Sequence, residues 1–119
     1  MKFYIKDSEV ELKFGLKFCR ELDQVYKVDY QGLEFGMGVN LAYMNLQQAN
    51  PVALTEVIKA ATAHLGFSIH EIDQAIETYA EKEGDLSTLF EQIETEMGKS
   101  ATVIHTIKTF SQQAKASES

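Results

Sequence analysis

The only proline of the chain, Pro51, directly follows Asn50, and this dipeptide is the clearest local signal in the sequence. Asparagine is a good N-cap and proline is favoured at the first helical position, so a helix is predicted to begin here. Its apolar row ends at Gly66, a residue suited to the end of a helix. The row consists of Val52, Leu54, Val57, Ile58, Ala61 and Leu65. One proline and few glycines in 119 residues favour long regular elements over loops.

Three further helices are predicted from apolar residues that recur every three and four positions. The first has the row Leu16, Cys19, Leu22, Val25 and Tyr26. A capping box of Ser68 and Glu71 begins the second, and Gly84 closes it. Its buried row is Ile69, Ile72, Ile76 and Tyr79. Asp85 caps the third, whose row is Leu86, Leu89, Phe90, Ile93 and Met97.

The start of the chain alternates apolar and charged residues, which is the pattern of a strand with one buried face. Residues 2–6 and 9–13 are predicted to form a β-hairpin that turns at Asp7 and Ser8. The segment from Asp29 to Gly38 contains three of the seven glycines and is expected to be a loop. It leads into a short helix predicted from about Val39 to Gln48.

The predicted fold is mainly α: a small helical bundle preceded by an N-terminal β-hairpin, or α+β with minor β. A chain of 119 residues is too short for two stable cores, so we expect a single domain, 1–119. Within it we expect the hairpin in 1–14, the helical bundle in 15–98 and a C-terminal amphipathic helix or tail in 99–119.

Cysteine content and hydropathy indicate a soluble cytoplasmic protein. The one cysteine, Cys19, excludes an internal disulfide and suits a reducing compartment. It falls in the apolar row of a helix, where a small buried thiol is expected rather than a nucleophile. No apolar run approaches the roughly 20 residues that a membrane helix needs. We therefore expect no membrane contact.

Acidic residues are concentrated between Glu71 and Glu96, where nine of them face only Lys82. The net charge of the chain is −7. Such a surface repels phosphate backbones, so nucleic acid is not expected as a partner. The segment is either an anionic docking surface for a basic partner or, more commonly, a solvated helix face that favours solubility.

No pattern marks a catalytic, cofactor or metal site. His70, Asp73 and Glu77 share one helix face, but a zinc site usually recruits a further ligand and no Cys or His pair has metal spacing. The glycines around Met37 lack the third glycine and the Lys-Ser/Thr ending of a phosphate loop. No serine or cysteine has a nucleophile motif. We interpret the chain as a non-enzyme without cofactors.

The candidate functional residues are therefore apolar ones that a partner could contact. The edge of the predicted hairpin is a candidate for self-association, because an unpaired strand edge is adhesive; its residues are Phe3, Tyr4 and Ile5. Two further groups are candidates for binding a client or another copy. They are Met37, Leu41 and Met44 after the glycine-rich segment, and Val103, Ile104, Ile107 and Phe110 in the C-terminal row. Ordinary core packing is the alternative for both groups.

Four segments, in this order after the hairpin, resemble the tail assembly chaperones of long-tailed bacteriophages of Gram-positive hosts. They are LKFGLKFCRELDQVY at 12–26, LEFGMGV at 33–39, NPVAL at 50–54 and AATAHL at 60–65. The resemblance extends over about residues 2–66. It implies a protein that binds the tape measure protein, keeps it soluble and helps the tail tube to polymerise around it. The major tail tube protein is a second implied partner.

The resemblance also implies that the protein acts in the host cytoplasm during phage assembly and is absent from the mature virion. Covering a long rod-shaped client requires repeated weak contacts, so we expect a homo-oligomer. Two alternatives stay open. One is a structural component of the virion, in the tail or the head–tail connector. The other is a small acidic regulator that binds a basic host partner through the segment Glu71–Glu96.

Overall fold

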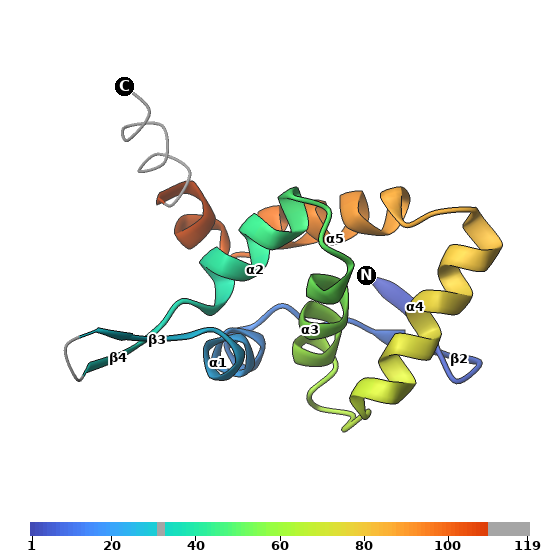
Figure 1. Cartoon of the computed structure of the whole chain (residues 1–119), viewed down its shortest axis with the longest axis horizontal. Helices are drawn as coiled ribbons and strands as arrows, with labels where there is room; N and C mark the ends of the chain where they lie inside the picture. The colour runs from blue at the N-terminus through green and yellow to red at the C-terminus, as the bar shows by residue number, and fades with distance from the viewer. Residues whose placement is uncertain (31–32, 110–119) are drawn as a thin grey trace.

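The computed structural model describes residues 1–30 and 33–109. The elements are β1 (Lys2–Ile5), β2 (Ser8–Glu11), α1 (Leu16–Val25), β3 (Lys27–Tyr30), β4 (Leu33–Gly36), α2 (Gly38–Gln47), α3 (Pro51–Ala61), α4 (Ile69–Glu83) and α5 (Ser87–Lys99). A further helical segment spans 104–109. Helices and hairpins together measure 44 × 30 × 24 Å. The two hairpins lie toward opposite ends of the long axis (Figure 1). The mainly α class with minor β is confirmed.

Two of the predicted helix starts are confirmed by their caps. The Asn50 side chain accepts a hydrogen bond from the Val52 N–H at 3.1 Å, and Pro51 is the first residue of α3. At α4, the Glu71 N–H donates to Ser68 Oγ at 3.1 Å, and the Ser68 N–H donates to Glu71 Oε1 at 2.9 Å. These bonds satisfy backbone donors that have no partner within the helix. The predicted cap of α5, Asp85, was wrong: the N-cap residue is Leu86, and Asp85, one residue before it, accepts a hydrogen bond at Oδ1 from the Ser87 N–H at 3.0 Å.

The helix ends agree with prediction less closely. Gly84, with φ at +90°, closes α4 in the left-handed conformation that glycine adopts without strain. In contrast, α3 ends at Ala61 and not at Gly66. The buried Thr62 follows, and its hydroxyl donates to the Ile58 carbonyl at 2.8 Å. This side-chain bond occupies a carbonyl of the last helical turn, and residues 62–66 form a turn.

The first hairpin turns one residue earlier than predicted. Ile5 pairs with Ser8, so the two turn residues are Lys6 and Asp7, both with positive φ. This is the backbone that two-residue hairpins favour. The register sets Lys2 opposite Glu11, whereas a turn at residues 7 and 8 would set Lys2 opposite Lys13. Like charges directly across a sheet are destabilising, which explains the observed turn.

One core joins the first hairpin to the helices. The hairpin contributes Phe3, Ile5, Val10 and Leu12, all buried, and the centres of the predicted helical rows are buried as well. The prediction was wrong at the ends of these rows, where the side chains are 47–62% exposed: Leu16, Val25, Val52, Leu65 and Ile69. Phe18, which was not predicted, is buried in α1. Periodicity identifies the inner side of a helix but not how far the neighbouring elements extend along it.

The segment from Asp29 to Gly38 was predicted to be a loop, and this is wrong for most of it. Strands β3 and β4 form a second antiparallel hairpin with Val28 opposite Phe35 and Tyr30 opposite Leu33; residues 31 and 32 lie outside the described residues. The sequence of both strands alternates apolar and polar residues, which is the strand pattern. The predicted short helix follows as α2.

Residues after α5 return to the beginning of the chain. The Ser100 and Thr102 hydroxyls both donate to the Phe14 carbonyl, at 2.8 and 2.6 Å. Val103 is fully buried and Ile107 is 7% exposed in the same core as the first hairpin. The described part of the C-terminal row therefore packs on its own chain.

Candidate interaction surfaces

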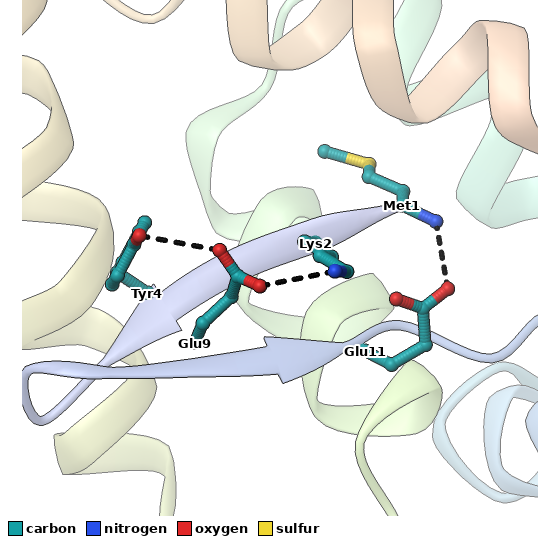
Figure 2. Close-up of polar contacts among 5 residues, drawn as sticks. All are labelled: Met1, Lys2, Tyr4, Glu9 and Glu11. Atoms are coloured by element: carbon teal, nitrogen blue, oxygen red, sulfur yellow. Dashed lines mark hydrogen bonds and ion pairs between the residues drawn. The ribbon is translucent and has the colours of Figure 1, made fainter.

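On the exposed face of the first hairpin, charged groups pair with one another within the hairpin. Figure 2 shows Lys2, Tyr4, Glu9 and Glu11 on this face. Lys2 Nζ lies 3.2 Å from Glu9 Oε1, and the Tyr4 hydroxyl donates to Glu9 Oε2 at 3.2 Å. The hydrogen bond from Lys2 lowers the pKa of Glu9, and the same bond raises the pKa of Lys2. Phe3 and Ile5 point to the core, so Tyr4, 64% exposed, is the hairpin candidate whose side chain a partner can reach.

An ion pair links the turn of this hairpin to α4. Lys6 Nζ lies 2.8 Å from Glu71 Oε2. The hydrogen bond from Lys6, followed by the one from the Ser68 backbone, lowers the pKa of Glu71 to about 2. Glu71 therefore serves both the capping box and the hairpin, and it stays ionised throughout the physiological range.

The candidates around α2 are half-buried. Met37, Leu41 and Met44 each expose part of the side chain. Met37 lines a hollow of about 220 Å³ that also includes Cys19 and Thr106. Burial, followed by the charge of Asp23, raises the pKa of the Cys19 thiol, which opposes formation of a thiolate. The hollow therefore has the properties of a packing defect between α1, α2 and the C-terminal segment rather than of a reactive site.

The C-terminal candidates differ in accessibility. Val103 and Ile107 are covered by their own chain, Ile104 is half-buried, and Phe110 lies outside the described residues. The structure thus leaves Ile104 as the described member of this row with accessible apolar surface.

A groove between α3 and α4 was not identified from the sequence. It encloses about 230 Å³, and its lining is mostly apolar with two acids: Pro51, Val52, Thr55, Asp73, Ile76, Glu77, Ala80 and Leu86. Val52 stands at the groove with 61% of its surface exposed. The Thr55 hydroxyl donates to Asp73 Oδ1 at 2.6 Å and holds that carboxylate in place. The sequence pattern did not mark this groove, because Val52 continues an apolar row that was predicted to be buried.

The acidic segment Glu71–Glu96 lies on helices α4 and α5. Five of its nine carboxylates are exposed, and those of Glu71, Asp73, Glu94 and Glu96 are half-buried. Burial, followed by the charge of Glu91, raises the pKa of Glu94. Among the described residues, His70, Asp73 and Glu77 included, no three His, Cys, Asp or Glu side chains come together as a metal site. No helix within the described ranges is long and apolar enough to cross a membrane.

The comparisons with known proteins give one match. No curated protein and no solved structure shows a significant match to this chain. A family model described as phage tail assembly chaperone protein, TAC, matches residues 2–112. The match includes both hairpins, all five labelled helices and the acidic segment beyond residue 66. The chain therefore belongs to the phage tail assembly chaperone family.

Proposed function

We propose that this tail assembly chaperone binds the tape measure protein, keeps it soluble and assists assembly of the tail tube around it. The general chaperone role follows from the family. The identity of the client is our proposal, and the α3–α4 groove is the observation that supports it best.

The groove has the chemistry of a site for an amphipathic helix. Val52 and Ile76 provide apolar surface, and Asp73 and Glu77 line the same groove with negative charge. A helix that inserts an apolar side chain here, flanked by lysine or arginine, would bury apolar area and meet opposite charge at the border. Long helical rods expose apolar stripes of this kind and aggregate when these stripes are uncovered.

Many copies are needed to cover such a rod. A single shallow groove gives weak binding, but copies bound side by side along one client, and to each other, hold it by avidity. Under this proposal the protein acts without catalysis in the host cytoplasm, contacts the major tail tube protein when the tube forms, and is absent from the mature virion. Mass spectrometry of purified virions tests the last point, because finding the chain there would favour a structural role.

The experiment that tests the function is co-expression with the tape measure protein of the same phage. We expect the unmodified chain to increase soluble tape measure protein several-fold and to co-purify with it in about 1 M salt, because apolar contacts resist screening. Val52→Asp should abolish both effects. Leu16→Asp is the matched control, since Leu16 is 62% exposed and Val52 is 61% exposed. No increase in solubility with the unmodified chain would contradict the proposal.

A further inference from the structure

The first turn of α1 carries an exposed leucine with two basic side chains beside it. Leu16 is 62% exposed, and Lys17 and Arg20 are exposed as well. Residues three or four positions apart on a helix lie on the same face, so Arg20 is a neighbour of both Leu16 and Lys17. We call Leu16, Lys17 and Arg20 the α1 patch.

The two cations of the α1 patch are not neutralised by acids. The ion pairs of the described residues involve other cations, and neither Lys17 nor Arg20 takes part in one. Glu21 follows Lys17 by one turn and lies farther around the helix from Leu16. The N-cap of α1, Gly15, has no side chain to cap the helix, and the first turn contains no acid. The positive end of the helix dipole therefore adds to the charge of the patch.

The α1 patch complements the α3–α4 groove in shape and in charge. The patch presents one protruding apolar side chain, and the groove is a hollow of about 230 Å³ with a mostly apolar lining. Asp73 and Glu77 line the groove, and no lysine or arginine is among its described lining residues. The hydrogen bond from Thr55 holds the Asp73 carboxylate in place. A helix with an apolar side chain and adjacent cations matches this site.

The α1 patch lies apart from the groove of its own chain. Helix α1 packs against α3, and α3 packs against α4, so α3 stands between α1 and the far wall of the groove (Figure 1). The space beside the patch is open, because a Cβ added at Gly15 would meet nothing within 4 Å. A second copy of the chain can approach there, and it carries the same acidic groove.

We propose that the α1 patch of one copy docks in the α3–α4 groove of a second copy. Leu16 buries its side chain against Val52 of the groove, and Lys17 and Arg20 face the two carboxylates at its border. The contact is heterologous, because it joins two different surfaces of the chain. Each bound pair therefore leaves one patch and one groove unoccupied, and further copies can add at both places.

The same contact controls access of the client to the groove. This part of the inference rests on the proposed function, in which the groove receives a helix of the client. Another copy and the client then compete for one site. Without a client, the copies cover each other's exposed apolar surface, and a client with many matching segments displaces them by avidity.

A pair of complementary variants tests the contact. Light scattering of the unmodified chain should show a mass that rises above that of the monomer with concentration. Leu16→Asp and Val52→Asp should each weaken this association at least about tenfold, because an unpaired charge would enter the apolar contact. An equimolar mixture should form one-to-one pairs and stop there, since one variant supplies only an intact groove and the other only an intact patch. An unmodified chain that stays monomeric, or a mixture without pairs, would overturn the proposal.

Charge reversal tests the orientation of the helix in the groove. Arg20→Glu and Glu77→Arg should each weaken association at least about fivefold, and mixing the two variants should restore it, because opposite charges then meet again. Lys108→Glu makes the same change in net charge at another exposed position and is the control, with no expected effect. Equal weakening by Lys108→Glu, or a mixture that does not recover, would contradict the proposed contact.

Co-expression with the tape measure protein separates this inference from the proposed function. Leu16→Asp should lose self-association yet keep at least as much tape measure protein soluble as the unmodified chain, because its groove is intact and uncovered. Val52→Asp should lose both properties. If the mixed variants pair but no variant keeps the tape measure protein soluble, self-association stands and the proposed client is wrong. If Leu16→Asp associates like the unmodified chain, the inference is wrong, whatever happens to the client.

Discussion

The two β-hairpins of this chaperone have the same design but different surroundings. Each is an antiparallel pair of two strands of four residues. The first places its apolar face in the helical core, pairs its own charges and is tied to α4 through Lys6. The second projects from the body and sets Asp29 opposite Glu34. A hairpin of two strands is marginally stable alone, and the helices cover the first hairpin by burying its apolar side chains in their core.

In the first hairpin, a diagonal Lys2–Glu9 ion pair is complete within the two strands. The two hairpins therefore differ chiefly in how closely the helices hold them. The predictions below test this difference, from the largest expected effect to the smallest.

The largest effect is expected in the core of the first hairpin. Ile5 is fully buried, so Ile5→Ala should reduce the free energy of unfolding by about 2–5 kcal/mol in urea titrations, through lost burial and a cavity. Tyr4→Ala, at the adjacent exposed position, should change it by less than about 0.5 kcal/mol. Similar losses at both positions would show that the first hairpin does not close the core.

The base of the second hairpin should be the next most sensitive place. A Cβ at Gly38 would collide with the backbone of Leu22 and Asp23, so α2 can approach α1 closely only with glycine there. We expect Gly38→Ala to destabilise by about 1–3 kcal/mol in the same assay. Gly98→Ala is the control, because a Cβ there meets nothing within 4 Å and α5 should gain about 0.5–1 kcal/mol.

The smallest effect is expected at the tie between the first hairpin and α4. The pKa of Glu71 is lowered to about 2, chiefly by the hydrogen bond from Lys6, so its stabilising contribution is present above the unfolded pKa of about 4.5 and is lost as pH falls toward 2. Glu71→Gln should therefore lower the melting temperature slightly at pH 7, and the difference should shrink steadily as pH falls from about 5 toward 2. Glu81→Gln, which removes one negative charge from the same helix away from Lys6, is the control for net charge. A difference between Glu71→Gln and the unmodified chain that stays constant from pH 7 to pH 2 would argue against the ion pair.

Features encoded within a few neighbouring residues were predictable from the sequence. The Asn50 cap and the Ser68 capping box each need one side chain and one nearby amide, and both are present as predicted. The second hairpin was predictable in principle, because the apolar residues of β3 and β4 alternate. Glycines in the same segment suggested irregular backbone instead, and that interpretation was wrong.

Features that depend on distant partners were not predictable from one sequence. The pattern at Val103 and Ile107 indicates an apolar helix face, but the segment that covers it includes residues near Phe14. Likewise, Val52 belongs to an apolar row yet stands exposed at the groove with α4, because the neighbouring helices do not extend over it. The interaction surfaces were located incompletely for the same reason, since exposure is decided by packing between elements.

The two hydroxyl bonds to the Phe14 carbonyl have a consequence for the order of events at the ribosome. Ser100 and Thr102 follow Phe14 by 86 and 88 residues, so the beginning of the chain leaves the exit tunnel long before its partners are made. At roughly 5–20 residues per second, this delay is on the order of 4–17 s. Until residues 100–107 have been translated, the core around the first hairpin lacks Val103 and Ile107, so the early elements stay incompletely covered during this interval.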